Sequence, residues 1–350
     1  MTRLSELGES AVLRRLLAHR RAGSHEVVGP GDDAAVTKIT GDLVSTADML
    51  VEGEDFTRDW LDWSRLGVKA AAQNLADVCA MGAAPHGLLV SLAVPDSTEA
   101  GDLEALFSGI VTEAERAGRE LGCTVPIIGG DLSSSGLIVT AITALGTVSA
   151  EEGAITRSGA RPGDEIWLAG TLGRAAGGLD LLFAGARPGD DLPEGLASLI
   201  ATQLAPQPDY AAMAHRPAAS AMIDVSDGLS TDLGRIADAS GVHAEIDRTA
   251  LDDLVAPLRP AARYVLAARA ADGAGGDDAG AGGAVSDDAV EALALHWVLD
   301  GGEDHGFVAS SPVSAADPVG WRRIGEMQAG SGVGLDGAPV PTSGFSHFGK

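Results

Sequence analysis

Aspartates that follow glycine or end an apolar stretch recur along this chain, and their side chains could bind cations. Gly29-Pro30-Gly31 is followed directly by Asp32 and Asp33, and then by an apolar run. Glycine lets a backbone approach a ligand closely, and aspartate supplies the hard oxygen atoms that divalent cations prefer. A single Gly-Asp-Asp turn is weak evidence, because aspartate commonly bonds its own backbone in turns.

Four further segments carry the same feature, and this repetition makes the pattern informative. The acids in these segments are Asp48, Asp77, Asp131 and Asp224, with Asp227 following the last of them. Each alone is explained equally well as a turn or cap residue. Together they predict one shared cation site, because α/β sheets gather strand ends on one rim. Two carboxylates about 4 Å apart repel by roughly 4 kcal/mol at a protein-like dielectric, so a cluster of acids needs cations.

Mg²⁺ is the cation that such a cluster favours. It prefers oxygen ligands and is usually shared with substrate phosphates. Zinc is disfavoured, since the pattern contains no His or Cys ligands. The sequence has no Gly-x-x-x-x-Gly-Lys-Ser/Thr motif and lacks the protein-kinase motif set, so phosphates would have to be held through metals and glycine-rich turns.

Length and composition predict a globular protein of two domains. The chain has 350 residues, of which 45% are hydrophobic and 21% charged. A net charge of −26 argues against a general nucleic-acid binder. No apolar run is long enough for a membrane span, and the N-terminus lacks the apolar core of a signal peptide, so we expect no membrane partner and a cytoplasmic location.

The apolar spacing predicts strands alternating with helices, which indicates an α/β or α+β fold. We place a domain boundary near residue 150, where a polar turn leads into a new strand at 165–169. A long helix is expected over 64–80 with Ser64 as its cap, and a short strand over 124–128 is expected to end before Gly129-Gly130-Asp131. Residues 271–288 are acidic and of low complexity, which predicts a flexible loop.

One face of the predicted helix 64–80 is polar. Lys69, Gln73, Asn74 and Asp77 are spaced by three and four residues, so they share that face. An ordinary solvent-exposed face and the wall of a polar cavity both explain this spacing.

Taken in order, these motifs resemble the thiamine-monophosphate kinase family over nearly the whole chain. Several are shared with the wider superfamily of aminoimidazole-ribonucleotide synthetase and selenophosphate synthetase. A selenophosphate synthetase would carry a reactive Cys near its N-terminus, whereas the first cysteine here is Cys79. The motifs that carry the resemblance are Gly-Asp-Asp-Ala-Ala at 31–35, Asp-Met-Leu-Val-Glu-Gly at 48–53, the segment 69–83, Gly-Gly-Asp at 129–131, the segment 156–164, Asp-Val-Ser-Asp-Gly-Leu at 224–229 and Gly-Gly-Glu-Asp at 301–304.

The resemblance implies a two-domain fold of the aminoimidazole-ribonucleotide-synthetase type, α/β (α+β) in class. Residues 1–150 would form an N-terminal domain that binds metal and ATP and pairs in a homodimer. Residues 151–350 would form a C-terminal α/β domain that completes the cleft for ATP and substrate. The implied reaction is the phosphorylation of thiamine monophosphate to thiamine diphosphate, with ATP as co-substrate and several Mg²⁺ ions.

The resemblance also implies roles for individual residues. The expected metal ligands are Asp32, Thr46, Asp48, Asp77, Asp131, Asp224 and Asp227, and among them Asp32, Asp77, Asp131 and Asp224 are expected to be catalytic. The expected ATP contacts are Gly130, Asp131, Arg157 and Ser226, and the expected substrate contacts are Asp55, Glu303 and Phe345.

The implied chemistry needs no general base. The nucleophile is a phosphate oxygen, and the second pKa of a phosphate monoester is about 6, so it is largely ionised at neutral pH. The obstacle is an anion attacking an anion, which cations and a positive side chain overcome by positioning and charge neutralisation. Arg157 is the candidate for that positive side chain, although a solvated surface arginine explains it equally well.

Two positions depart from the family pattern. Ala47 stands where the family usually has a hydroxyl residue, and Asp55 stands where it usually has His in Gly-x-His-Phe. A carboxylate at Asp55 could face the cationic thiazolium ring. Two alternatives therefore stay open: another ATP-dependent enzyme of the same fold, and a catalytically silent dimer that binds nucleotide or cations.

Overall fold

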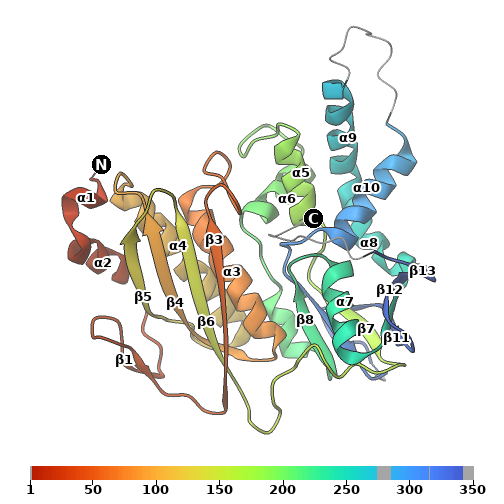
Figure 1. Cartoon of the computed structure of the whole chain (residues 1–350), viewed down its shortest axis with the longest axis horizontal. Helices are drawn as coiled ribbons and strands as arrows, with labels where there is room; N and C mark the ends of the chain where they lie inside the picture. Colours follow the sequence, from red (N-terminus) through yellow and green to blue (C-terminus); the bar gives the residue numbers. More distant parts are fainter. Residues whose placement is uncertain (1, 274–284, 315, 342–350) are drawn as a thin grey trace. The chain divides into compact units, whose positions relative to one another are not determined.

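The structure is a computed structural model that describes residues 2–273, 285–314 and 316–341 (Figure 1). Its internal contacts divide the chain into two compact units, Met1–Ile155 and Thr156–Lys350. Phe345, one of the predicted substrate contacts, lies outside the described residues. None of the described helices is both long enough and apolar enough to cross a lipid bilayer.

Unit 1 is built on a four-stranded sheet whose strand order is β3-β6-β4-β5. The sheet is antiparallel except for the parallel pair β4 and β5. Helices α3 and α4 cover one face and leave the other face open (Figure 1). The elements of unit 1 are α1 (Leu4–Leu7), α2 (Glu9–Leu17), β1 (Glu26–Val28), β2 (Val36–Thr37), β3 (Asp42–Val51), α3 (Trp63–Ala80), β4 (Ala84–Val94), α4 (Ala100–Leu121), β5 (Ile127–Ser134) and β6 (Val139–Val148).

Unit 2 is built on a seven-stranded sheet of order β13-β12-β9-β11-β7-β10-β8. Helix α7 packs against β8, β9 and β12, and α10 packs against α9, α7, α5 and α8. The strands of unit 2 are β7 (Glu165–Ala169), β8 (Ala221–Val225), β9 (His243–Ile246), β10 (Gly306–Ser311), β11 (Trp321–Gln328), β12 (Gly332–Leu335) and β13 (Ala338–Pro339). Its α-helices are α5 (Arg174–Phe183), α6 (Glu194–Leu204), α7 (Leu229–Ser240), α8 (Asp252–Val255), α9 (Arg259–Gly273) and α10 (Asp287–Asp300).

Three local expectations from the sequence were wrong. The helix α3 is capped by Asp62, whose side chain accepts a hydrogen bond from the backbone N–H of Arg65, and not by Ser64. Gly129-Gly130-Asp131 lies inside β5 and does not follow the strand. The bounds of the predicted loop at 271–288 are wrong at both ends, because α9 continues to Gly273 and α10 begins at Asp287, and residues 274–284 lie outside the described residues.

The two helices of unit 1 cross in close contact at a pair of glycines. A Cβ atom added to Gly67 on α3 would stand 2.0 Å from the carbonyl oxygen of Leu106 on α4. A Cβ atom on Gly109 would likewise stand 2.0 Å from the carbonyl oxygen of Ser64. The helix backbones therefore touch at this crossing, which holds α3 and its polar residues at a fixed depth against the sheet.

Gly67→Ala tests this crossing. Alanine normally stabilises a helix interior by about 1 kcal/mol relative to glycine. Here the methyl group would push two helix backbones apart, so we expect the free energy of unfolding to fall by roughly 1–3 kcal/mol. Gly101→Ala on α4 is the matched control, because a Cβ atom there meets nothing within 4 Å. Denaturant unfolding that shows the same small change in both variants would contradict the crossing.

Candidate active site

In unit 1 a small polar cluster joins β3 to α3. The Thr46 hydroxyl donates to Asp77 Oδ2 over 2.7 Å, and the backbone N–H of Asp48 donates to Asn74 Oδ1 over 3.0 Å. The Asn74 amide also donates to the carbonyl of Ala70, one turn earlier on α3. Thr46, Asp48 and Asp77, all predicted as metal ligands, are thus held close together.

Asn74 is the residue that sequence reasoning did not place in the site. Its side chain is fully buried and connects the helix to the strand that carries Thr46 and Asp48. The spacing of Asn74 and Asp77 by three residues had indicated a shared polar face. The structure shows that this face is turned toward β3.

Asp131 stands apart from this cluster. Asp131 on β5 pairs with Ser91 on β4, Ser91 pairs with Ala141 on β6, and Ala141 pairs with Met49 on β3. Strands β5 and β3 are the two opposite edges of the sheet. Strands lie about 4.8 Å apart, so three steps separate Asp131 from β3 by roughly 14 Å. Asp131 lies in the row of Met49, on the open face, whereas Thr46 and Asp48 face the helices.

Three more predicted residues of unit 1 lie in turns or at a strand contact. The Asp32 carboxylate is exposed and accepts a hydrogen bond from the N–H of Asp33. The Asp55 carboxylate accepts the N–H of Val51 over 2.7 Å and so closes the turn after β3. A Cβ atom at Gly130 would stand 1.8 Å from the carbonyl oxygen of Val90, so the strand pairing alone requires glycine there.

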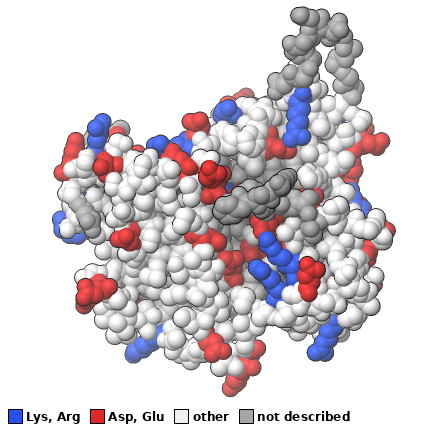
Figure 2. Space-filling view, in the orientation of Figure 1, with Lys and Arg blue, Asp and Glu red and all other residues white. Residues whose placement is uncertain are grey.

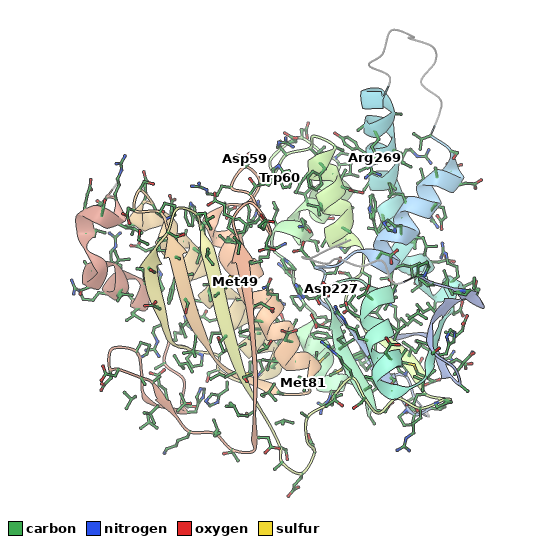
Figure 3. All side chains as sticks on the ribbon, viewed as in Figure 1. Met49, Asp59, Trp60, Met81, Asp227 and Arg269 are labelled. Carbon is green, nitrogen blue, oxygen red and sulfur yellow. The ribbon has the colours of Figure 1, made fainter. Side chains whose placement is uncertain are left out.

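In unit 2 the end of β8 and the start of α7 form a second cluster, in which Asp227 lies at the N-terminal end of α7 (Figure 3). The buried Asp224 on β8 lies 3.2 Å from Nδ1 of the buried His305. The backbone N–H of Glu303 donates to the carbonyl of Ser226 over 2.9 Å. Unit 2 thus brings together the predicted residues Asp224, Ser226, Asp227 and Glu303.

Asp232 holds the turn between β8 and α7. It is fully buried, and its Oδ2 accepts the N–H groups of Ser226 and Asp227 over 3.0 and 2.9 Å. Arg235 forms an ion pair with Asp232 and, over 2.6 Å, with Asp227 Oδ2. Burial raises the pKa of Asp232 to about 6, although the hydrogen bond from Asp227 and the charge of Arg235 act in the opposite direction.

The neighbouring carboxylate of Asp304 caps a helix. It accepts the N–H groups of Arg174 and Ala175 at the start of α5, together with the hydroxyl of Thr171. Burial raises its pKa above the usual range for aspartate. The Gly-Gly-Glu-Asp motif thus contributes Glu303 to the cluster, while Asp304 anchors α5.

Arg157 lies away from this cluster. Its carbonyl accepts a hydrogen bond from Ser240, the last residue of α7, whereas Asp227 precedes the first turn of that helix. Twelve residues of helix separate the two ends, which corresponds to roughly 16–18 Å. The guanidinium of Arg157 is exposed, and the structure records no hydrogen bond or ion pair for it within the described residues.

The donor atoms suit Mg²⁺, although no complete cage is formed. Across residues 2–273, 285–314 and 316–341, no group of three or more His, Cys, Asp or Glu side chains is arranged to hold a metal ion. Mg²⁺ usually keeps several waters and is bound through one or two carboxylates together with substrate phosphates. Carboxylate and hydroxyl oxygens such as those of Asp77 and Thr46, 2.7 Å apart, fit that mode of binding.

Comparison with known proteins assigns the family. Residues 31–148 match the model of the AIR synthase related protein N-terminal domain, and residues 161–272 match that of the C-terminal domain. A thiamine-monophosphate kinase of Mycobacterium tuberculosis (strain CDC 1551 / Oshkosh) is 38% identical over 354 residues, covering 99% of this chain and 93% of the relative. The chain belongs to the thiamine-monophosphate kinase family. This confirms the resemblance that the motifs indicated.

Solved structures of the family share the fold. A thiamine-monophosphate kinase from Stenotrophomonas maltophilia K279a aligns with a TM-score of 0.71 at 30% identity, covering 95% of this chain and 96% of that chain. AaThiL complexed with AMPPCP and TMP aligns with a TM-score of 0.69 at 28% identity, covering 99% of both chains. The predicted two-domain α/β fold of the aminoimidazole-ribonucleotide-synthetase type is therefore confirmed.

Asp232→Ala tests the turn that carries Ser226 and Asp227. The change leaves two backbone N–H groups without their acceptor and removes one partner of Arg235, so we expect a loss of roughly 2–4 kcal/mol in the free energy of unfolding. Asp238→Ala is the matched control on the same helix, since Asp238 is exposed, and should change stability by less than about 0.5 kcal/mol. Equal unfolding midpoints for the two variants would refute the role of Asp232.

Proposed function

We propose that this chain transfers the terminal phosphoryl group of ATP to the phosphate of thiamine monophosphate, forming thiamine diphosphate. The supporting observation is the similarity over 99% of both chains to AaThiL, which was solved with AMPPCP, an ATP analogue, and TMP. The full-length relative from M. tuberculosis bears the same activity in its name. We expect the reaction to take place in the cytoplasm, as part of thiamine diphosphate biosynthesis.

The residues of the two clusters suit direct phosphoryl transfer. The attacking phosphate oxygen is already ionised near neutral pH, so none of these side chains has to remove a proton. Bound Mg²⁺ would neutralise the phosphates and help to hold them in line. Asp77 and Thr46 are the ligands we propose in unit 1, and Asp224 and Asp227 those in unit 2.

The remaining predicted residues keep their roles as part of this proposal. Asp32 and Asp131 have exposed carboxylates that a cation could reach, and Asp48 is an exposed residue of β3. Arg157 offers an exposed guanidinium for the ATP phosphates. Asp55 and Glu303 are proposed as substrate contacts. Each of them also has a hydrogen bond within its own unit, from the Val51 N–H and from the Gln203 amide respectively.

The proposed homodimer rests on the open face of the unit 1 sheet. The alternation of β3 and the register of its neighbours place mainly apolar and small polar side chains there, and Asp131 is the one charged residue among them. Leu43 and Met49 are 51% and 56% exposed. Figure 2 shows that this face of the molecule carries few charged atoms. The open-face residues, by strand, are Leu43, Ser45, Ala47, Met49 and Val51; Val139, Ala141, Thr143, Leu145 and Thr147; Leu89, Ser91 and Ala93; and Gly129, Asp131 and Ser133.

A second copy of this chain is the occupant we propose for that face. Large apolar faces are rare on monomers and are typical of obligate interfaces. The chain carries a net charge of −26, yet this face has almost no charge that would repel an identical face. Pairing of two such faces would bury Leu43 and Met49 and would bring Asp131 into the interface.

The activity is tested by measuring ADP formation from ATP and Mg²⁺ with and without thiamine monophosphate. We expect turnover that depends on thiamine monophosphate and yields thiamine diphosphate. Asp77→Asn and Asp131→Asn should each reduce turnover by at least about a hundredfold, because each removes a negative charge that we propose as a cation ligand, one on the helix-covered face of the sheet and one on its open face. Asparagine at 77 keeps an acceptor oxygen for Thr46, so the fold should persist.

Asp42→Asn is the control for the loss of one negative charge, because Asp42 is exposed at the start of β3 and has no proposed role. It should retain normal turnover. An equal rate of ADP formation with and without thiamine monophosphate would refute the proposed substrate. Near-normal turnover in both Asp77→Asn and Asp131→Asn would refute the proposed ligands while leaving the reaction in place.

Met49→Asp tests the dimer. A charge at this position of the open face would have to be buried without a partner in the dimer, so we expect the variant to elute as a monomer in size-exclusion chromatography with light scattering. Val313→Asp is the control, because Val313 is 72% exposed and lies in unit 2. The proposal fails if the native chain is monomeric at micromolar concentration, or if both variants remain dimeric.

A further inference from the structure

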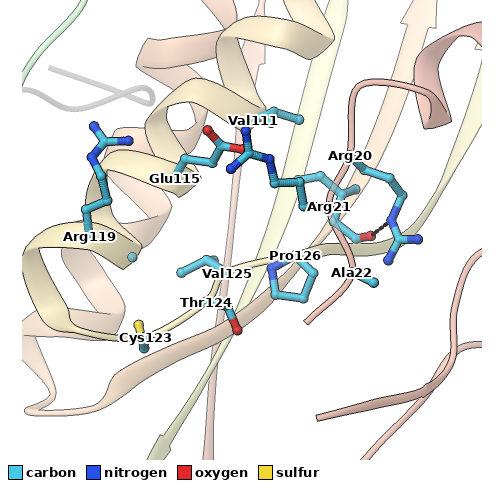
Figure 4. Close-up of a pocket in the computed structure, with 12 residues that line it drawn as sticks. Arg20, Arg21, Ala22, Val111, Glu115, Arg119, Cys123, Thr124, Val125 and Pro126 are labelled. Carbon is cyan, nitrogen blue, oxygen red and sulfur yellow. Dashed lines mark hydrogen bonds and ion pairs between the residues drawn. The ribbon is translucent and has the colours of Figure 1, made fainter. Parts of the chain in front are cut away.

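A cavity lies at the C-terminal end of α4, and none of the predicted site residues lines it. Its volume is about 250 Å³. The walls come from the last turns of α4, from the segment at 20–22 after α2, and from the segment at 123–127 that leads into β5 (Figure 4). All of these residues belong to unit 1, so the cavity is complete within one compact unit.

The floor of the cavity is apolar. Val125, Pro126 and Ile127 are buried and form its base, and the half-buried Val111 adds an apolar side. The thiol of Cys123 also lines the cavity, and burial raises its pKa, so at neutral pH it is a neutral and weakly polar group. This surface suits a compact apolar body such as a single ring or a branched alkyl group.

The rim of the cavity is cationic. Arg20, Arg21 and Arg119 line it, together with one acid, Glu115. Three of the 24 basic residues of a chain with a net charge of −26 are thus gathered around one small cavity. Such a local excess of positive charge favours an anion over a cation or a neutral ligand.

The three arginines differ in how firmly they are held. Arg20 is fixed by an ion pair with Glu26 and a 3.0 Å hydrogen bond to the carbonyl of Ile127. Arg21 reaches across to Glu115 over 3.0 Å, but its side chain is 82% exposed, and exposed pairs of this kind contribute little stability. Arg119 is exposed, and the structure records no hydrogen bond or ion pair for it within the described residues. Arg21 and Arg119 can therefore turn toward a ligand at little cost.

We propose that this cavity binds a small organic anion, a phosphate or carboxylate carried on a compact apolar body. The apolar body would lie on Val125 and Pro126, and the anionic group would bind Arg119 and draw Arg21 away from Glu115, which lies between the two arginines (Figure 4). Cavities that hold drug-sized ligands typically measure about 300–1,000 Å³, so the ligand of this cavity is smaller than a drug-sized molecule. The site is independent of the proposed kinase reaction, because it shares no residue with either cluster.

Cys123 supplies a local reporter for this test. The chain has two cysteines: Cys79 is 1% exposed, and Cys123 is half-buried in the wall of the cavity. Iodoacetamide at a pH of about 9 should alkylate Cys123 in the folded chain and spare Cys79, which intact-mass measurement and peptide mapping can follow. Phenyl phosphate is the probe, since it joins one ring to one phosphate.

Phenyl phosphate should slow the alkylation of Cys123 in a saturable way, by about tenfold when its concentration is ten times its Kd. Arg119→Ala should raise the Kd for phenyl phosphate by roughly tenfold, because a charge-assisted hydrogen bond is lost. Arg119→Lys should restore part of the affinity. Arg14 is an exposed arginine on α2 outside the cavity, so in Arg14→Ala phenyl phosphate should protect Cys123 as well as it does in the native chain. Inorganic phosphate, which lacks the ring, should protect less.

Two results would overturn the proposal. One is an unchanged alkylation rate at up to roughly 10 mM phenyl phosphate, a concentration that nearly saturates even a millimolar site. The other is equal protection in Arg119→Ala and the native chain, which would show that the probe acts elsewhere. Thermal unfolding of each variant confirms that the compared chains are folded, and the assay does not depend on turnover.

Discussion

A buried backbone N–H group must be paired, and this requirement shapes both candidate clusters. In unit 1 the buried side chain of Asn74 accepts the N–H of Asp48 and so fixes β3 against α3. In unit 2 Asp232 accepts two N–H groups from the turn after β8, and Asp304 accepts two from the start of α5. An unpaired buried donor costs about 1–3 kcal/mol, so these three side chains determine where the neighbouring acids lie.

Close packing of backbone at glycines also fixes the position of the turns in the unit 2 cluster. A Cβ atom at Gly302 would stand 2.0 Å from the carbonyl oxygen of Ser226, and a Cβ atom at Gly228 would stand 2.7 Å from the carbonyl carbon of Asp300. The turns that carry Ser226 and Glu303 are therefore pressed together, and the hydrogen bond from the Glu303 N–H to Ser226 closes the contact. The glycines of the Asp-Gly-Leu and Gly-Gly-Glu-Asp motifs thus have a packing role that is separate from any contact with ligand.

The sequence allowed the local elements to be predicted, but not the order of the strands. Apolar spacing located α3 and β7 to within one residue, and the motif series indicated the family that the comparisons confirm. It could not show that β3 and β5 are opposite edges of one sheet, because strand pairing is a long-range property. For that reason Asp48 and Asp131 looked alike as acids on strands, whereas the structure separates them. The cap of α3 was missed because Asp62 and Ser64 are both good capping residues two positions apart.

The acids that were predicted to need cations have partners of their own within the chain. Asp77 accepts the hydroxyl of Thr46, Asp224 faces His305, and Asp227 is paired with Arg235. Mutual repulsion therefore does not decide whether the chain folds, because these partners hold the acids in place without a cation. A cation that binds Asp227 must compete with a guanidinium 2.6 Å away. In the proposed reaction the phosphate groups of ATP would favour the cation at Asp227. They would add ligands for the cation, and they would also offer the displaced Arg235 another anion.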